Sequence, residues 1–175
     1  MESDTVSAKT KEPLNGCRGV FVALTYDQIA SLVGIRTDWE MLEQVREVME
    51  ACFPHRSLGC DKSWDAMHRC LSDGTLNPTG GSYPLNRCVL GGVQLYEESG
   101  CIITFVPPNE VKDVAAALPS VGKLEMRKRF FALKGYEGPQ NEDDCEYTWA
   151  YFEEVRDFYA KAAQEKLGMI FFVDQ

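Results

Sequence analysis

Residues 147–173 read YTWAYFEEVRDFYAKAAQEKLGMIFFV, and this stretch contains both of the patterns on which the predicted fold depends. Its first part spaces apolar residues as one face of an α-helix does: Tyr151, Val155, Phe158 and Ala162. Gly168 ends that pattern, since glycine readily takes the left-handed conformation that closes a helix. Met169–Val173 is a short continuous apolar run, which is typical of a buried strand. We therefore expect a helix over 147–166 and a strand over 169–173.

The same two patterns alternate upstream along the chain. Apolar runs predict strands over 19–24 and 101–106. Apolar stripes and capping residues predict helices over 25–34, 37–53, 61–71, 108–118 and 123–133, with Asp61 as the cap of the third. Residues 85–92 fit either a helical turn broken by Gly91 and Gly92 or the edge of a strand.

Helix-rich blocks combined with few strands are typical of an α+β domain. We expect a small central β-sheet, mostly mixed in strand direction, that several amphipathic helices cover. The 175 residues fit one domain, which we place at residues 17–175. Residues 1–16 are polar and include Pro13 and Gly16, and we expect them to form a flexible tail.

The charge balance restricts the classes of partner. The chain has 27 acidic and 18 basic side chains, for a formal net charge of −9. Nucleic acids and anionic membranes are bound by clustered Lys and Arg, so this balance argues against both. It fits a basic protein partner.

The cysteines and the first residues indicate the compartment. Seven cysteines are an odd number, form no CxxC pair and lie mostly in apolar patterns. Residues 1–15 lack the apolar segment of a signal peptide, and no apolar run reaches the ~20 residues of a membrane span. These features predict reduced thiols and a cytoplasmic location. We expect no metal and no cofactor, since these residues match no common zinc spacing: Cys52, His55, Cys60 and His68.

A candidate pocket centres on the helix expected over 61–71. Asp61, Asp65 and His68 fall on one stripe, and two carboxylates with an imidazole can hold a divalent metal or transfer protons. The structural alternative is that Asp65 pairs with Arg69 and that His68 packs beside Trp64. The functional interpretation predicts a pocket formed by these residues: Asp61, Lys62, Trp64, Asp65, His68, Gly91 and Gly92.

An acidic cluster precedes the last helix. Five acids lie within 137–146 with no Lys or Arg among them, so we expect a solvated, mobile loop. In one interpretation these acids only complement the positive end of the helix dipole. In the other, acids steer a basic protein and aromatic side chains anchor it. The predicted partner surface is then Glu142, Asp143, Asp144, Tyr147 and Trp149.

Two segments carry a resemblance to a known family. Residues 61–68, DKSWDAMH, resemble the D-K-x-W-x-x-[LM]-H element of the YfbM-like family, a bacterial family of unknown function (DUF1877). Residues 85–92, LNRCVLGG, resemble its L-x-x-x-V-L-G-G element. The run over 101–118 and the closing helix and strand fit the layout of that family. The resemblance implies a compact α+β fold and supplies no activity.

Two functions stay open at this point. The first is a non-enzymatic interaction module that uses the acidic cluster with Tyr147 and Trp149, favoured because the chain shows no complete catalytic constellation. The alternative is a small-molecule-binding protein or an enzyme with a pocket around four residues: Asp61, Trp64, Asp65 and His68.

Overall fold

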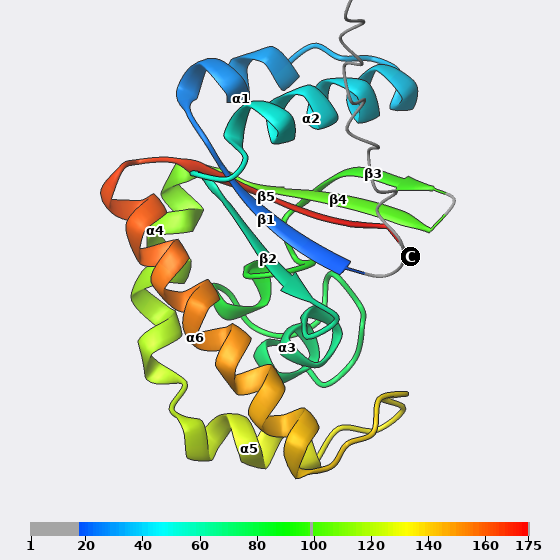
Figure 1. The fold of residues 1–175 in the computed structure, drawn as a ribbon, viewed down its shortest axis with the longest axis vertical. Coiled ribbons are helices and arrows are strands. Elements are labelled where there is room, and N and C mark those ends of the chain that lie inside the picture. The colour runs from blue at the N-terminus through cyan, green and yellow to red at the C-terminus, as the bar shows by residue number, and fades with distance from the viewer. Residues whose placement is uncertain (1–17, 99, 175) are drawn as a thin grey trace, which may run out of the picture.

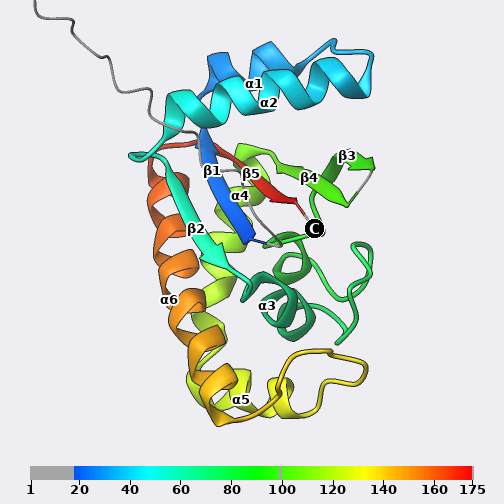
Figure 2. The same ribbon diagram turned by 45° about the vertical axis from the view of Figure 1, so that its right-hand side comes forward.

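The structure is a computed structural model, and it describes residues 18–174 apart from residue 99. A five-stranded sheet lies between two layers of helices (Figure 1, Figure 2). Its strands follow in space the order β2 (Ser57–Asp61), β1 (Arg18–Leu24), β5 (Gly168–Asp174), β4 (Cys101–Val106) and β3 (Val93–Glu98). This confirms the α+β class.

All neighbouring strands of the described sheet run antiparallel. The expectation of a mostly mixed sheet was therefore wrong. The reason lies in the connections. A parallel neighbour requires a single crossover, usually one helix. Here two helices within residues 26–52 join β1 to β2, and three helices within residues 108–164 join β4 to β5 (Figure 1). Each set of helices returns the chain to the end of the sheet that it left, as the pairings of Val22 with Ser57 and of Val106 with Met169 show.

Helices cover both faces of the sheet. The pair α1 (Tyr26–Leu32) and α2 (Asp38–Cys52) covers one face, at the top of Figure 1. The other layer holds α3 (Trp64–Leu71), α4 (Pro108–Ala117), α5 (Lys123–Phe131) and α6 (Glu142–Gln164). Two short 3-10 turns, η1 (Leu85–Arg87) and η2 (Leu118–Ser120), complete the described elements.

The sheet separates two hydrophobic cores, one on each of its faces, and β1 contributes side chains to both. Phe21 and Ala23 belong to the core shared with α3, α4 and α6, while Val22 and Leu24 belong to the core under α1 and α2. Successive side chains of a strand point to opposite faces, and both faces are covered here. The central strands are therefore apolar throughout, which is the pattern that their sequences display.

Three elements differ from the sequence-based expectation. Asp61 does not cap a helix, because it is the last residue of β2 and pairs with Gly19 of β1, and α3 begins at Trp64. The strands β2 and β3 were not predicted. The helix α6 begins at Glu142 rather than Tyr147. The expected tail over 1–16 lies outside the described residues.

Within residues 18–174, residue 99 excepted, none of the helices combines the length and the hydrophobicity that a membrane crossing requires.

Candidate functional site

A hollow of about 420 Å³ lies at the N-terminal end of α6, where this helix meets the junction between β2 and α3. We call it the Tyr147 hollow, and it is lined by Lys62, Tyr136, Gly138, Pro139, Asn141, Asp143, Asp144 and Tyr147. Its volume falls within the range of about 300–1,000 Å³ that is usual for ligand pockets. The hollow brings together Lys62, from the predicted pocket, and three residues of the predicted partner surface: Asp143, Asp144 and Tyr147.

Two tyrosines are fixed in its wall by their hydroxyl groups. The Tyr147 hydroxyl donates to Asp61 Oδ2 at 2.9 Å and accepts the backbone N–H of Lys62 at 3.2 Å. Burial, and then the bond to Asp61, raises the pKa of Tyr147 to about 12. The Tyr136 hydroxyl donates to Asp144 Oδ2 at 2.9 Å, and burial together with this bond raises its pKa. Both phenols are therefore protonated at neutral pH and held in one orientation.

The acids at the start of α6 are helical, which corrects the expected loop for residues 142–146. Glu142 pairs with Arg127 at 2.5 Å, and Glu146 pairs with Lys123 at 2.6 Å. Lys123 and Arg127 both lie on α5, next to the N-terminal end of α6 (Figure 2). Asn141 caps the helix by accepting the Asp144 N–H at 2.9 Å. The compensating charges thus come from another helix and were invisible in the local sequence.

Two charges in the Tyr147 hollow have no such compensation. In the described part of the chain, the Asp143 carboxylate forms neither an ion pair nor a hydrogen bond, and the Lys62 ammonium forms no ion pair. Both side chains are exposed. These two groups are free to meet a ligand.

His68 lies in the core and not in this hollow. Its ring is fully buried, and Nδ1 accepts the backbone N–H of Leu90 at 3.4 Å. Nε2 therefore carries the proton and donates it to the Asn77 carbonyl at 3.2 Å. Burial lowers the pKa of His68 below its ordinary value. Both nitrogens of the ring are used in holding the backbone of the loop before β3.

The neighbours of His68 on α3 also serve the fold. Trp64 is only 4% exposed and packs against Phe171 of β5, with the ring centroids 6.1 Å apart. Asp65 pairs with Arg69 at 2.6 Å, as the structural interpretation of this segment predicts. Across the residues that the structure describes, no three Cys, His, Asp or Glu side chains form a group that could hold a metal ion.

Trp149 stands apart from the Tyr147 hollow. Two residues along a helix turn the side chain by about 200° around the axis, so Tyr147 and Trp149 cannot share a face. Trp149 is half-buried and packs against Phe152, with the ring centroids 5.3 Å apart. The structure therefore separates Trp149 from the other members of the predicted partner surface.

Comparison with known proteins places the chain in a family. A family model described as a domain of unknown function (DUF1877) matches residues 16–172. The chain belongs to this family. The solved structure of YfbM from Escherichia coli, a protein of unknown function, is 18% identical and superposes with a TM-score of 0.67. The match covers 89% of this chain and 99% of YfbM, and at this identity it shows the fold alone. No curated protein matches the chain.

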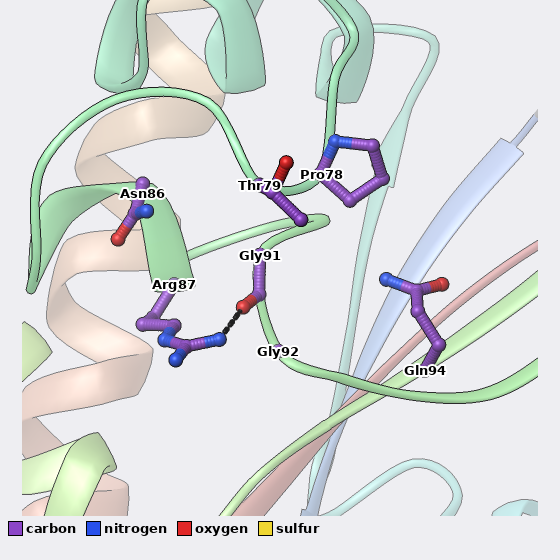
Figure 3. Close-up of a pocket in the computed structure, with 7 residues that line it drawn as sticks. All are labelled: Pro78, Thr79, Asn86, Arg87, Gly91, Gly92 and Gln94. Carbon is purple, nitrogen blue, oxygen red and sulfur yellow. Dashed lines mark hydrogen bonds between the residues drawn. The ribbon is translucent and has the colours of Figure 1, made fainter.

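A second, smaller hollow of this DUF1877 domain, of about 190 Å³, contains the two glycines of the predicted pocket (Figure 3). Arg87 donates to the Gly91 carbonyl across its wall. A Cβ atom on Gly91 would lie 2.0 Å from the Asn86 oxygen, and one on Gly92 would lie 2.6 Å from the Phe105 oxygen. Glycine is thus required at both positions by the close approach of other backbone segments.

Sequence reasoning missed four residues of the Tyr147 hollow: Tyr136, Gly138, Pro139 and Asn141. A local signal existed for Asn141, because asparagine followed by acids is a typical start of a helix. No local signal existed for Tyr136, whose position depends on the packing of its ring against Phe130, with centroids 5.8 Å apart.

Proposed function

We propose that this DUF1877 protein is a non-enzymatic interaction module that binds a basic segment of a partner protein in the Tyr147 hollow. One observation carries the proposal: Asp143, a carboxylate without a partner in the part of the chain that the structure describes, lies in a hollow whose two tyrosines are held by hydrogen bonds. Tyrosine is enriched at the energetic centres of protein interfaces. Walls that are ordered before binding reduce the entropy that association costs.

The positions of the reactive side chains support a binding role. Burial raises the pKa of the Cys60 thiol to about 12, which keeps it protonated and weakly nucleophilic at neutral pH. His68 uses both ring nitrogens on backbone groups, and Asp65 is paired with Arg69. His68 and Asp65, which the alternative function would use for chemistry, instead contact groups of the fold itself.

The charge of the whole chain supports a basic partner. A formal net charge of −9 attracts cationic segments over several ångströms and raises the rate of encounter at low salt. Within the Tyr147 hollow, Asp143 then offers a local counter-ion beside the apolar face of Tyr147. The long stems of Lys and Arg pack well on such apolar surfaces while their charges reach a carboxylate.

Fluorescence anisotropy with labelled 12-residue peptides that carry from zero to four Lys or Arg residues tests the proposal. At low salt we expect the basic peptides to bind, and Asp143→Asn to weaken them by about two- to five-fold, as for one exposed ion pair. The matched control is Glu137→Gln, which removes the same charge from an exposed residue of the adjoining loop that does not itself line the hollow. Failure of every basic peptide to bind, or equal weakening by both variants, would refute the proposal.

A further inference from the structure

We infer that the segment bound in the Tyr147 hollow carries an acidic residue close to its basic residue, an inference that rests on the proposed function. Among the described residues, the hollow presents one uncompensated charge of each sign, the Lys62 ammonium and the Asp143 carboxylate. A segment with both charges would satisfy both groups at once. A purely basic segment would satisfy Asp143 and meet the like charge of Lys62.

The position of Lys62 is set by its backbone. Its N–H donates to the Tyr147 hydroxyl at 3.2 Å, which ties the junction between β2 and α3 to the wall of the hollow. The adjacent carboxylate of Asp61 already accepts a hydrogen bond from Tyr147 and lies 3.2 Å from Arg18 Nε. Asp61 is therefore occupied, and the Lys62 ammonium is left exposed at the rim.

The position of Asp143 follows from the helix that carries it. Its neighbours Glu142 and Glu146 are drawn toward α5 by Arg127 and Lys123. The Asp144 carboxylate accepts the Tyr136 hydroxyl within the wall. Asp143 is the acid of this turn that has no partner within the described residues, and it lines the same hollow as Lys62 without pairing with it.

The two charges together set a specificity. Like-charge juxtaposition disfavours wrong partners, so Lys62 selects against polybasic segments that the net charge of −9 would otherwise attract. Opposite charges of the partner then fix its direction in the hollow, because reversing the segment would bring like charges together. Charge of one sign alone would give neither effect.

Four 12-residue peptides of one sequence test the inference: one with a Lys and a Glu, one with each charge alone after replacement of the other by Gln, and one with neither. We expect the wild type to bind the peptide with both charges about two- to five-fold more tightly than the Lys-only peptide at low salt. Lys62→Glu should reverse this preference. The matched control is Lys134→Glu, a charge reversal on an exposed lysine outside the hollow that should leave the preference unchanged.

The outcomes separate the inference from the proposed function. If the Lys-only peptide binds as tightly as the peptide with both charges, in the wild type and in Lys62→Glu, the inference is overturned and the interaction module stands. If no peptide binds, both are overturned. If a free Lys-Glu dipeptide binds as tightly as the 12-residue peptide, a small zwitterion replaces the protein segment as the ligand.

Discussion

His68 is a titratable side chain that the fold uses in a single protonation state. The neutral ring offers one acceptor to the Leu90 N–H and one donor to the Asn77 carbonyl. A protonated ring has two donors, so the Leu90 N–H would then face a donor in the core. An unsatisfied buried N–H of this kind costs about 1–3 kcal/mol.

We predict that His68 makes the protein less stable as the pH falls below about 6.5. Because burial lowers the pKa of His68 in the native chain, the unfolded chain takes up a proton near pH ~6.5 and the native chain only at lower pH. The stabilising contribution of His68 is fully present above about pH 6.5 and is lost as the pH falls toward the pKa of His68 in the native chain.

Urea unfolding at about pH 7.5 and about pH 5.5 measures this loss. The free energy of unfolding should fall more between the two pH values in the wild type than in His68→Gln. Replacing the exposed His55 in the same way should leave the wild-type difference intact. Equal pH dependence in the wild type and His68→Gln would contradict the assigned role.

At the scale of elements, the central and the edge strands differ in how well their sequences predict them. The strands β1, β5 and β4 are central, are covered on both faces, and were predicted from their apolar runs. The strands β2 and β3 form the two edges, and β2 contains the exposed Gly59. An edge strand buries less surface, so its pattern is weaker, and its existence depends on a partner distant in sequence.

For the same reason, only part of the candidate site could be predicted from the sequence. Its residues on α6 were identified from local charge and aromatic content, and Lys62 from a family-like segment. Their meeting in one hollow depends on β2 pairing with β1, which turned the predicted cap Asp61 into a strand end. Local periodicity carries no information about such a pairing.

The turn that leads into β3 yields a second prediction. Gly91→Ala should destabilise the protein by about 1–3 kcal/mol, because the added methyl group would overlap the Asn86 carbonyl. Chemical denaturation measures the change. Gly59→Ala is the control, since an added Cβ there meets nothing within 4 Å. Equal stabilities of the two variants would mean that the close approach at Gly91 does not constrain the fold.

At the scale of the whole molecule, stability rests on two apolar cores. Five of the described cysteines are buried thiols outside any disulfide: Cys52, Cys60, Cys70, Cys88 and Cys145. Because the described residues hold no group of metal ligands, we predict that an excess of EDTA leaves the melting temperature unchanged. Differential scanning fluorimetry provides the measurement, and a decrease of several degrees would reveal a structural metal.

The central claim is that the protein binds its partner in the Tyr147 hollow, at the N-terminal end of α6. The competing surface is the layer of α1 and α2, on the opposite side of the sheet, where large apolar side chains are also exposed: Tyr26, Trp39 and Phe53. Exposed aromatic residues of this kind can also anchor a partner. The two surfaces are far enough apart for residue-level mapping to distinguish them.

Backbone amide chemical-shift mapping of the ¹⁵N-labelled protein, titrated with the peptide that carries both charges, tests this claim most directly. The account predicts that the largest shifts fall on residues around the Tyr147 hollow, including Lys62, Tyr136 and Tyr147. It also predicts that Asp143→Asn requires about two- to five-fold more peptide to reach the same shifts, whereas Glu137→Gln titrates as the wild type does. Largest shifts on α1 and α2, or shifts spread evenly over the molecule, would contradict it.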